Sequence, residues 1–283
     1  MRPRRPRLGF GLTAAGAGLT AGVVVVLAGA TAGCDAGKTK VIGADYPTCQ
    51  NAPVAPPASL GVSSFYGKYL DGDGIPVLSS PAVSDQAVVS ACLIVTHMLV
   101  KRDDVRMAMI NQGMTVAVIG VNEVTTQIPE YRNLNAMFPN QNWDRLRGVG
   151  ATIMIPVSSV GEENLLCLQN DTFAGEQLLV QTFATAVLLG VEDADSTFES
   201  RLNAAFQAAT STGLWRDTYA AVNEIEYYAE GVQSWFDANH YVAQPDGNNG
   251  PISTRGELKA YDPSLATLIS ETMRDDAWRP SCP

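Results

Sequence analysis

The stretch Gly175–Gly190, with the sequence GEQLLVQTFATAVLLG, lies in the middle of the chain and is apolar almost throughout. It contains no charged residue after Glu176. Leu, Val and Ala form a run that is too long for an ordinary strand, which predicts a buried helix over about residues 174–189. We therefore expect a fold that is organised around this apolar helix.

Strand and helix patterns occupy the rest of the chain. Two apolar, β-branched runs, Thr115–Gly120 and Ala151–Val160, predict strands, and Pro156 suggests that the second lies at a sheet edge. Ser84 is typical of a helix N-cap. The apolar residues that follow it at helical spacing are Val88, Cys92, Val95 and Leu99. Further helices are predicted over 103–111, 196–212, 224–239 and 263–273. Early strands and late helices indicate one α+β domain with a small mixed sheet over residues 60–283.

Length and charge limit the classes of protein to which the chain can belong. The 283 residues are 46% hydrophobic, which is enough for one substantial core. Charged residues make up only 17%, so the chain is not a disordered acidic protein. The formal net charge is −10 and no basic stripe occurs outside the N-terminus. We therefore expect no nucleic-acid partner.

Residues 1–33 have the pattern of an export signal. Four arginines precede an uncharged run from Leu8 to Gly33, and small residues lead into Cys34. Thr31-Ala32-Gly33-Cys34 is similar to a bacterial lipobox, although Thr31 replaces the usual large aliphatic residue. Cys34 is thus a candidate for lipidation. The alternative is an uncleaved membrane anchor, because the apolar run is long enough to span a bilayer.

Either alternative predicts an exported protein, in the cell envelope or outside the cell, that contacts the membrane only through this N-terminus. Removal of residues 1–33 takes away four arginines and no acidic residue, so the net charge changes from −10 to −14. The Pro/Ala-rich segment 34–59 is predicted to be a linker.

Cysteine usage agrees with export. If Cys34 carries lipid, four cysteines remain, and an even number suggests two disulfides in an oxidising compartment. A Cys49–Cys282 bond would join the two ends of the domain and leave Cys92 to pair with Cys167. Free buried thiols are the alternative. The spacing of cysteines and histidines suggests no metal site.

Histidine content excludes the commonest zinc peptidase motif. In HExxH, two histidines one helical turn apart bind zinc, and the glutamate takes a proton from the metal-bound water. This chain has only two histidines, His97 and His240, which are too far apart in sequence to form that motif. We expect His97 to be a buried or half-buried structural residue of the helix that follows Ser84.

Three stretches nevertheless resemble a known family, in the same order along the chain. They are FYGKYLDGDGIPVLSS from residue 65, GEENLLC with GEQLLVQTFATAV from residues 161 and 175, and NEIEYYAEGVQSWFDAN from residue 223. These stretches resemble the catalytic domain of anthrax-lethal-factor-like zinc peptidases, in particular their secreted bacterial single-domain relatives. The resemblance covers about residues 60–280. It implies a zincin fold of the gluzincin type, with an active-site helix at about 174–189 and a third-ligand helix at about 224–239.

Position by position, the resemblance implies that half of the zinc site is missing. Gln181 and Thr185 stand where the family has its two zinc histidines, and Thr182 stands where it has the catalytic glutamate. The interior of the motif, Phe183 and Ala184, matches the family. The second half of the site is also kept: Glu226 falls on the third zinc ligand, Glu230 on a supporting acid and Tyr219 on the tyrosine that stabilises the oxyanion.

These substitutions imply that zinc is lost. Gln and Thr are weak neutral oxygen ligands, and one carboxylate is too little for zinc. We expect Glu226 to hydrogen-bond to Gln181 or to Tyr219 instead, because a buried polar group needs a partner. The sequence thus leans towards a protein without catalytic residues, metal or other cofactor, although whether it is an enzyme stays open.

Three functions are compatible with these residues. The first is an exported, catalytically inactive homologue that binds a peptide, a protein or an envelope component through the old cleft. The second is a hydrolase with a rebuilt non-zinc or atypical metal site around Glu226 and Tyr219. The third is a structural envelope lipoprotein. Two acidic pairs elsewhere are predicted to be plain turn residues, Asp71 with Asp73 and Glu162 with Glu163.

Overall fold

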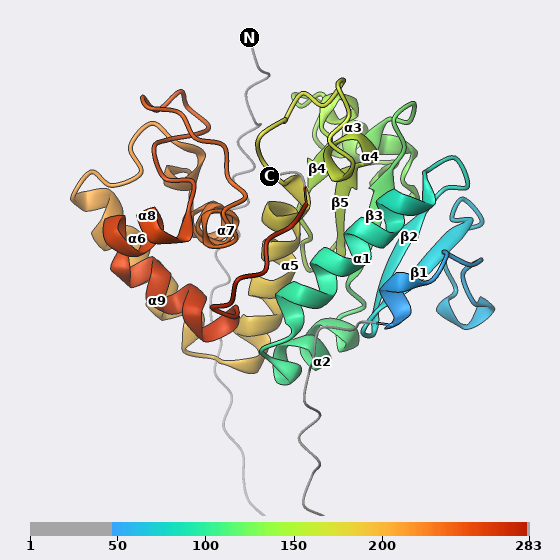
Figure 1. Cartoon of the computed structure of the whole chain (residues 1–283), viewed down its shortest axis with the longest axis horizontal. Coiled ribbons are helices and arrows are strands. Elements are labelled where there is room, and N and C mark those ends of the chain that lie inside the picture. Colours follow the sequence, from blue (N-terminus) through green and yellow to red (C-terminus); the bar gives the residue numbers. More distant parts are fainter. Residues whose placement is uncertain (1–46, 282–283) are drawn as a thin grey trace, which may run out of the picture.

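The computed structural model describes residues 47–281, and these residues form an α+β fold around one five-stranded sheet. The predicted export signal, the lipidation site Cys34 and Cys282 lie outside the described residues. No helix within residues 47–281 is both long and apolar enough to cross a membrane. Figure 1 shows the sheet and helices α1 and α2 on one side of the molecule and helices α6 to α9 on the other, with α5 between them.

The sheet is mixed, with the strand order β1-β2-β3-β5-β4. A tight turn joins β1 (Lys68–Gly72) to the antiparallel β2 (Ile75–Ser79), and in it the Asp71 carboxylate accepts a hydrogen bond from the Gly74 amide at 2.6 Å. Asp71 and Asp73 are therefore turn residues, as predicted. The next strands, β3 (Thr115–Ile119) and β5 (Val157–Gly161), run parallel to β2, and the short β4 (Gly148–Val149) closes the sheet in the antiparallel direction.

The second strand prediction was wrong in two respects. Strand β5 begins only at Val157, and it lies between β3 and β4 rather than at the edge. Pro156 has no amide hydrogen and stays outside the ladder, although its carbonyl accepts a hydrogen bond from Thr115 at 2.9 Å. The edge position belongs to β4, which was not predicted.

Alternating residues of the sheet face two separate cores. Val116 and Val118 belong to the larger core, which helices α1 (Asp85–Leu99) and α5 (Leu178–Ala194) cover. Ala117 and Ile119 belong to a smaller core on the opposite face. That face is covered by the long connection from β3 to β4, which contains η3 (Thr125–Gln127), η4 (Pro129–Tyr131), α3 (Leu134–Met137) and η5 (Trp143–Arg145).

The central helix exists but is shifted along the sequence. It was expected over 174–189, whereas α5 covers Leu178–Ala194. Gln177 is its N-cap, and Gly175 has a φ of 91°, a left-handed conformation that favours glycine and keeps residues 174–177 outside the helix. Every residue from Leu178 to Leu188 is buried, so α5 is surrounded by the protein on all sides.

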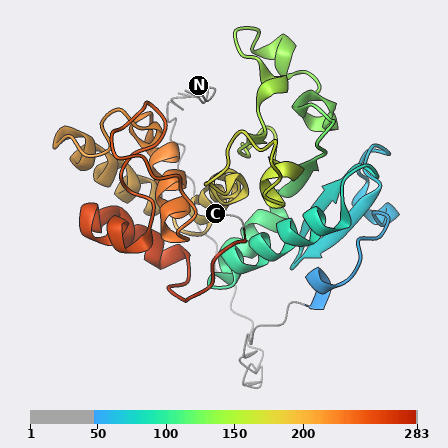
Figure 2. The same ribbon diagram turned by 45° about the horizontal axis from the view of Figure 1, so that its top comes forward.

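The C-terminal half is helical, and it packs against α5. It contains η6 (Tyr219–Ala221) and the helices α6 (Phe198–Ser211), α7 (Glu224–Trp235), α8 (Arg255–Tyr261) and α9 (Pro263–Thr272). Helix α7 ends four residues earlier than predicted, because the left-handed Asp237 (φ 52°) turns the chain. Figure 2 shows these helices grouped apart from the sheet. In the first half, α1 begins after the predicted N-cap Ser84, and α2 (Asp103–Asn111) and α4 (Glu162–Leu165) complete the helices.

Part of the predicted linker is folded. Residues Pro47–Gln50 form the short helix η1 and Ala58–Leu60 form η2, while Val54 pairs with Tyr69 at the outer edge of β1. The predicted linker therefore contributes to the domain at least from Pro47 onward. Val54 donates to the Tyr69 carbonyl at 3.0 Å and accepts from its amide at 2.7 Å, so this segment extends the sheet by one bridge.

The disulfide pairing differs from the expectation. Cys49 is bonded to Cys92, with 5.5 Å between the Cα atoms, so neither Cys49–Cys282 nor Cys92–Cys167 exists. The reason is that η1 packs on α1, where it buries Cys49 completely beside the inward face that carries Cys92. Cys167 is also disulfide-bonded. The prediction that cysteines form disulfides is thus confirmed, but the pairing was set by packing that the spacing does not reveal.

Candidate functional site

Helices α5 and α7 bring Gln181 and Glu226 into contact. The side-chain amide of Gln181 donates to one carboxylate oxygen of Glu226 at 3.2 Å. Both residues are buried, with exposed fractions of 7% and 8%. Glu226 is the third residue of α7, and its amide donates to the N-cap Asn223 at 2.8 Å. A carboxylate in the first turn of a helix interacts favourably with the helix dipole.

Tyr219 reaches the same carboxylate from the loop before α7. Its hydroxyl donates to the other oxygen of Glu226 at 3.1 Å. The Tyr219 amide donates to the Asn248 carbonyl at 2.8 Å, which fixes the short helix η6 against the loop that follows α7. The expected hydrogen bonds from Glu226 to Gln181 and to Tyr219 are therefore both present. Three positions that the resemblance assigned to one site meet at one carboxylate.

The hydroxyl groups of Thr182 and Thr185 bond to backbone carbonyls rather than to Glu226. The Thr182 hydroxyl donates to the Ser159 carbonyl of β5 at 3.0 Å, and the Thr185 hydroxyl donates to the Thr182 carbonyl at 2.7 Å. Strand β4 and the residue after it pass close to the two threonines, because a Cβ atom on Gly148 would lie 3.1 Å from the Thr182 methyl, and one on Gly150, which follows β4, would lie 2.6 Å from the Thr185 oxygen. These two glycines therefore let the edge strand approach α5.

Glu230 lies one helical turn after Glu226 and is almost fully buried. Asn239 donates to its carboxylate at 3.1 Å and to the Ser234 hydroxyl at 3.3 Å. The resemblance made Glu230 a supporting acid. Its contact with Asn239 joins the end of α7 to the chain that follows, so its visible role is to hold this helix and loop together.

The site residues do not fit a zinc ion. Catalytic zinc takes three protein ligands, which are mostly imidazole nitrogens, thiolates and carboxylates. Here Gln181 turns its N–H groups towards Glu226, and the Thr185 hydroxyl is hydrogen-bonded to a backbone carbonyl. Only Glu226 is an anionic donor. Within residues 47–281, no group of three or more His, Cys, Asp or Glu side chains could hold a metal ion.

The histidines lie on other elements. His97 is half-buried in α1, as expected, and stacks on Trp278 with 4.2 Å between the ring centroids. Burial lowers the pKa of His97, so the neutral ring is favoured. His240 follows α7 and packs beside Gly175, which has no Cβ atom to obstruct the ring.

Glu162 and Glu163 are not solvated turn residues, so that prediction was wrong. Both are buried at the start of α4. Glu162 accepts hydrogen bonds from the amides of Ser84 (2.7 Å) and Val121 (3.2 Å), and Glu163 forms a two-bond ion pair with Arg147 (2.5 and 2.8 Å). Their position after β5 places them at the carboxyl ends of the parallel strands. There they bond to the segments before α1, after β3 and before β4.

One carboxyl group has a pKa that is raised towards neutral pH. Burial, followed by repulsion from Glu199 and Glu224, raises the pKa of Glu192 to about 7. Glu192 belongs to the last turns of α5, Glu199 to α6 and Glu224 to the first turn of α7. This half-buried group thus changes its charge within the physiological pH range.

Sequence reasoning missed Asn223 and Asn239, which position the two glutamates. A signal for Asn223 was present, because Asn223 followed by Glu226 three residues later is a typical start of a helix. No comparable pattern marks Asn239, which reaches Glu230 only because the chain turns at Asp237 after α7. Asn239 could be found only from the folded chain.

Comparison with known proteins yields similarity in structure but not in sequence. No family model matches the sequence, and no curated protein matches it. Among solved structures, the fold is similar to that of the Pro-Pro endopeptidase PPEP-2 from Paenibacillus alvei, with a TM-score of 0.47 and 16% sequence identity. The similarity covers 69% of this chain and 96% of that chain. A similarity at this level gives no residue of this chain a role.

Proposed function

We propose that this chain is an exported, non-catalytic relative of zinc peptidases that binds a peptide, a protein or an envelope component. The convergence of Gln181 and Tyr219 on Glu226 carries the proposal. The sequence resemblance matched these three residues to a zinc ligand position, the oxyanion tyrosine and the third zinc ligand. Their meeting at 3.1–3.2 Å is what such a match requires, and an unrelated core helix would not require it.

The same contacts argue against hydrolysis. Water activation needs a Lewis acid or a base whose pKa lies near the working pH. Thr182, at the position of the catalytic glutamate, has an alcohol group that is hydrogen-bonded to Ser159. Glu226 is the one carboxylate of the contact, and Gln181 and Tyr219 both donate to it. A rebuilt hydrolase around Glu226 and Tyr219 is the alternative, and cleavage of peptides that depends on Glu226 would identify it.

The ligand is proposed to lie along β4. This strand is at the edge of the sheet, and within residues 47–281 no further strand pairs with its outer side. An extended peptide can add to such an edge through backbone hydrogen bonds, and its side chains then enter pockets on alternate sides. Because β4 lies against Thr182 and Thr185, a peptide bound there would pass beside the old site.

Restoration of the missing histidines tests the ancestry. The combined substitution Gln181→His with Thr185→His should create a site with Glu226 as third ligand and bind one zinc per chain. The matched control adds Glu226→Gln and should lose that zinc. Metal content after dialysis against zinc is the measurement, and the unaltered chain should hold no stoichiometric zinc. If the folded double variant binds no zinc, or binds it regardless of Glu226, the proposed ancestry of the site is wrong.

Binding is tested separately with a panel of extended peptides. A peptide that binds through β4 should lose its affinity when alternate backbone amides are N-methylated, because methylation removes the hydrogen-bond donors. The N-methylated peptide keeps the side chains and the charge of the original peptide, so it is a matched control. If no peptide binds, or if methylation changes nothing, the proposed binding along β4 fails, whereas the ancestry of the site is judged by the zinc experiment alone.

A further inference from the structure

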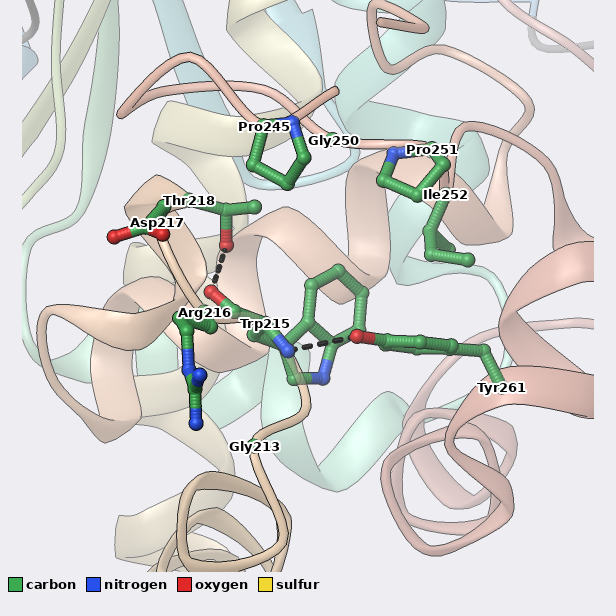
Figure 3. Close-up of a pocket in the computed structure, with 10 residues that line it drawn as sticks. All are labelled: Gly213, Trp215, Arg216, Asp217, Thr218, Pro245, Gly250, Pro251, Ile252 and Tyr261. Atoms are coloured by element: carbon green, nitrogen blue, oxygen red, sulfur yellow. Dashed lines mark hydrogen bonds between the residues drawn. The ribbon is translucent and has the colours of Figure 1, made fainter. Parts of the chain in front are cut away.

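A second candidate site lies in a pocket of about 240 Å³ between two loops of the C-terminal half. Its floor is the side chain of Trp215, and Tyr261 from the end of α8 forms one wall (Figure 3). The Trp215 amide donates to the Tyr261 hydroxyl at 2.8 Å, and the indole N–H donates to the buried Asp262 carboxylate at 3.0 Å. The two rings meet edge to face at 5.2 Å. These contacts fix the aromatic floor in place.

Apolar side chains line the pocket above Trp215. Pro245, Pro251 and Ile252 all come from the segment between α7 and α8, and Ile252 lies on the same side as Tyr261 (Figure 3). A small cavity with aromatic and aliphatic walls matches the side chain of one apolar residue rather than a large ligand.

The loop that carries Trp215 has an unusual backbone. Trp215 and Asp217 both adopt left-handed conformations, with φ values of 60° and 59°, which bulky residues rarely do. Hydrogen bonds hold the loop there: the Thr218 hydroxyl donates to the Trp215 carbonyl at 2.6 Å, and the Gly247 amide donates to the Asp217 carbonyl at 2.8 Å. Strained backbone that the surroundings enforce is typical of binding sites.

One positive and one negative side chain stand at the pocket without partners. Arg216 and Asp217 are both exposed, and no hydrogen bond or ion pair joins either side chain to the rest of residues 47–281. Several other arginines form ion pairs, as Arg147 with Glu163 and Arg255 with Asp275 show, whereas the exposed Arg145, like Arg216, has no ion pair among residues 47–281. In a protein with a net charge of −10, an unpaired guanidinium beside an apolar pocket is suited to an anion that arrives with the ligand.

We propose that this pocket binds an apolar side chain with a carboxylate next to it, as in an N-acylated amino acid or the C-terminal residue of a peptide. The apolar group enters between Trp215 and Ile252, and the carboxylate pairs with Arg216. Asp217 opposes the carboxylate and so limits the affinity. This site does not depend on Glu226 or on β4, and it stands whether or not the proposed function holds.

N-Acetyl-leucine is the probe, and N-acetyl-leucinamide is its control because it lacks only the charge. The full chain contains four tryptophans, so their indole N–H signals are resolvable by NMR, and Trp215→Phe identifies the one in the pocket. The acid should shift the Trp215 signal at concentrations on the order of millimolar, and the amide should bind roughly tenfold more weakly. Equal binding of acid and amide, or no shift of Trp215 with either, overturns the proposal.

Two substitutions at neighbouring exposed positions should act in opposite directions. Arg216→Gln should weaken binding of the acid about tenfold and leave the amide unchanged. Asp217→Asn should strengthen binding of the acid, and asparagine tolerates the left-handed backbone at this position. If both variants fold and neither changes the affinity for the acid, the carboxylate is not recognised and the proposal is wrong.

The source of the carboxylate is distinguished by one further probe, N-acetyl-Gly-Gly-Leu. Tighter binding than that of N-acetyl-leucine shows that the pocket takes the C-terminus of a peptide. Equal binding, with the same dependence on Arg216, shows that it takes a single acylated residue. Both results support a carboxylate pocket, whereas tripeptide binding that ignores Arg216 contradicts it.

Discussion

The ion pair between Arg147 and Glu163 should be the most sensitive polar contact in the domain. Glu163 is buried and Arg147 is partly buried, with side-chain exposures of 5% and 13%. Arg147 also donates to the carbonyls of Glu123 at 2.7 Å and Gly120 at 2.9 Å. The guanidinium therefore joins the loop after β3 to the start of α4. The substitution Arg147→Met keeps an unbranched apolar side chain in place of the arginine stem and removes all of these bonds.

The expected cost follows from the burial of Glu163. Removal of one partner of a buried pair leaves the other as an uncompensated charge, which destabilises a protein by about 3–5 kcal/mol. The freed carbonyls should add roughly 1 kcal/mol, so about 4 kcal/mol is the lower end of the expected loss. A loss of about 4 kcal/mol is a large part of a typical stability of about 5–15 kcal/mol. For a domain of this size it corresponds to a decrease in Tm of roughly 8–16 °C.

Urea and thermal unfolding, followed by circular dichroism, measure this loss. Arg145→Met is the matched control: Arg145 is exposed and makes no ion pair with the residues described, so the change should stay within about 0.5 kcal/mol. Joint replacement, Arg147→Met with Glu163→Leu, should recover at least half of the loss, because no unpaired charge remains. A cost below about 1 kcal/mol for Arg147→Met, or a double variant as unstable as the single one, would refute this account.

Three further changes test the fold. Because the native pKa of Glu192 is about 7 and lies above its unfolded value, the free energy of unfolding should decrease as the pH rises from roughly 4.5 to 7. In urea melts at several pH values, Glu192→Gln should remove this slope and add about 1–2 kcal/mol of stability at pH 8, after allowance for solvent screening. Cys92→Ala removes the bond to Cys49, which closes a 43-residue loop, and should cost about 4 kcal/mol in the same melts. Under reducing conditions the variant and the unaltered chain should be equally stable, because both then lack this bond. Gly161→Ala places a methyl group against the Glu163 carboxylate and should cost about 1–3 kcal/mol; unchanged stability would mean that this carboxylate can move aside.

The sequence was most informative where a single helix can be predicted from the residues within it. The apolar run around Phe183 predicted a buried helix, and Ser84 and Asp103 marked the starts of two others correctly. The predicted helix boundaries were wrong where one left-handed residue determines the start or the end of the helix. Gly175 delays the start of α5 and Asp237 ends α7 early, and neither left-handed turn is specified by hydrophobic periodicity.

Contacts between distant segments were the other limit. Adjacent acids such as Glu162 and Glu163 usually lie in solvent. The burial of Glu163 is favourable because Arg147 approaches from 16 residues away, and that of Glu162 because two distant backbone amides donate to it. The same holds for Cys49, which pairs with Cys92 because η1 folds onto α1. The contact of Glu226 with Gln181 was expected only because the family resemblance placed the two residues in one site.

On the proposed ancestry, Glu226 is a former zinc ligand, and its contacts would explain how a zinc site lost its chemistry without loss of its fold. A zinc ligand that keeps its place after the metal is lost becomes a buried carboxylate, which is costly unless donors replace the cation. The amide of Gln181 and the hydroxyl of Tyr219 supply such donors, one to each oxygen of Glu226, and the first turn of α7 adds a favourable dipole. Histidine at position 181 could make a similar bond, but without metal it would also titrate near neutral pH. Glutamine keeps the contact and removes that titration. On the proposed ancestry, the change at 181 is therefore a compensation that allows Glu226 to stay, and Gln181→Leu should destabilise the chain more than Glu226→Leu combined with Gln181→Leu.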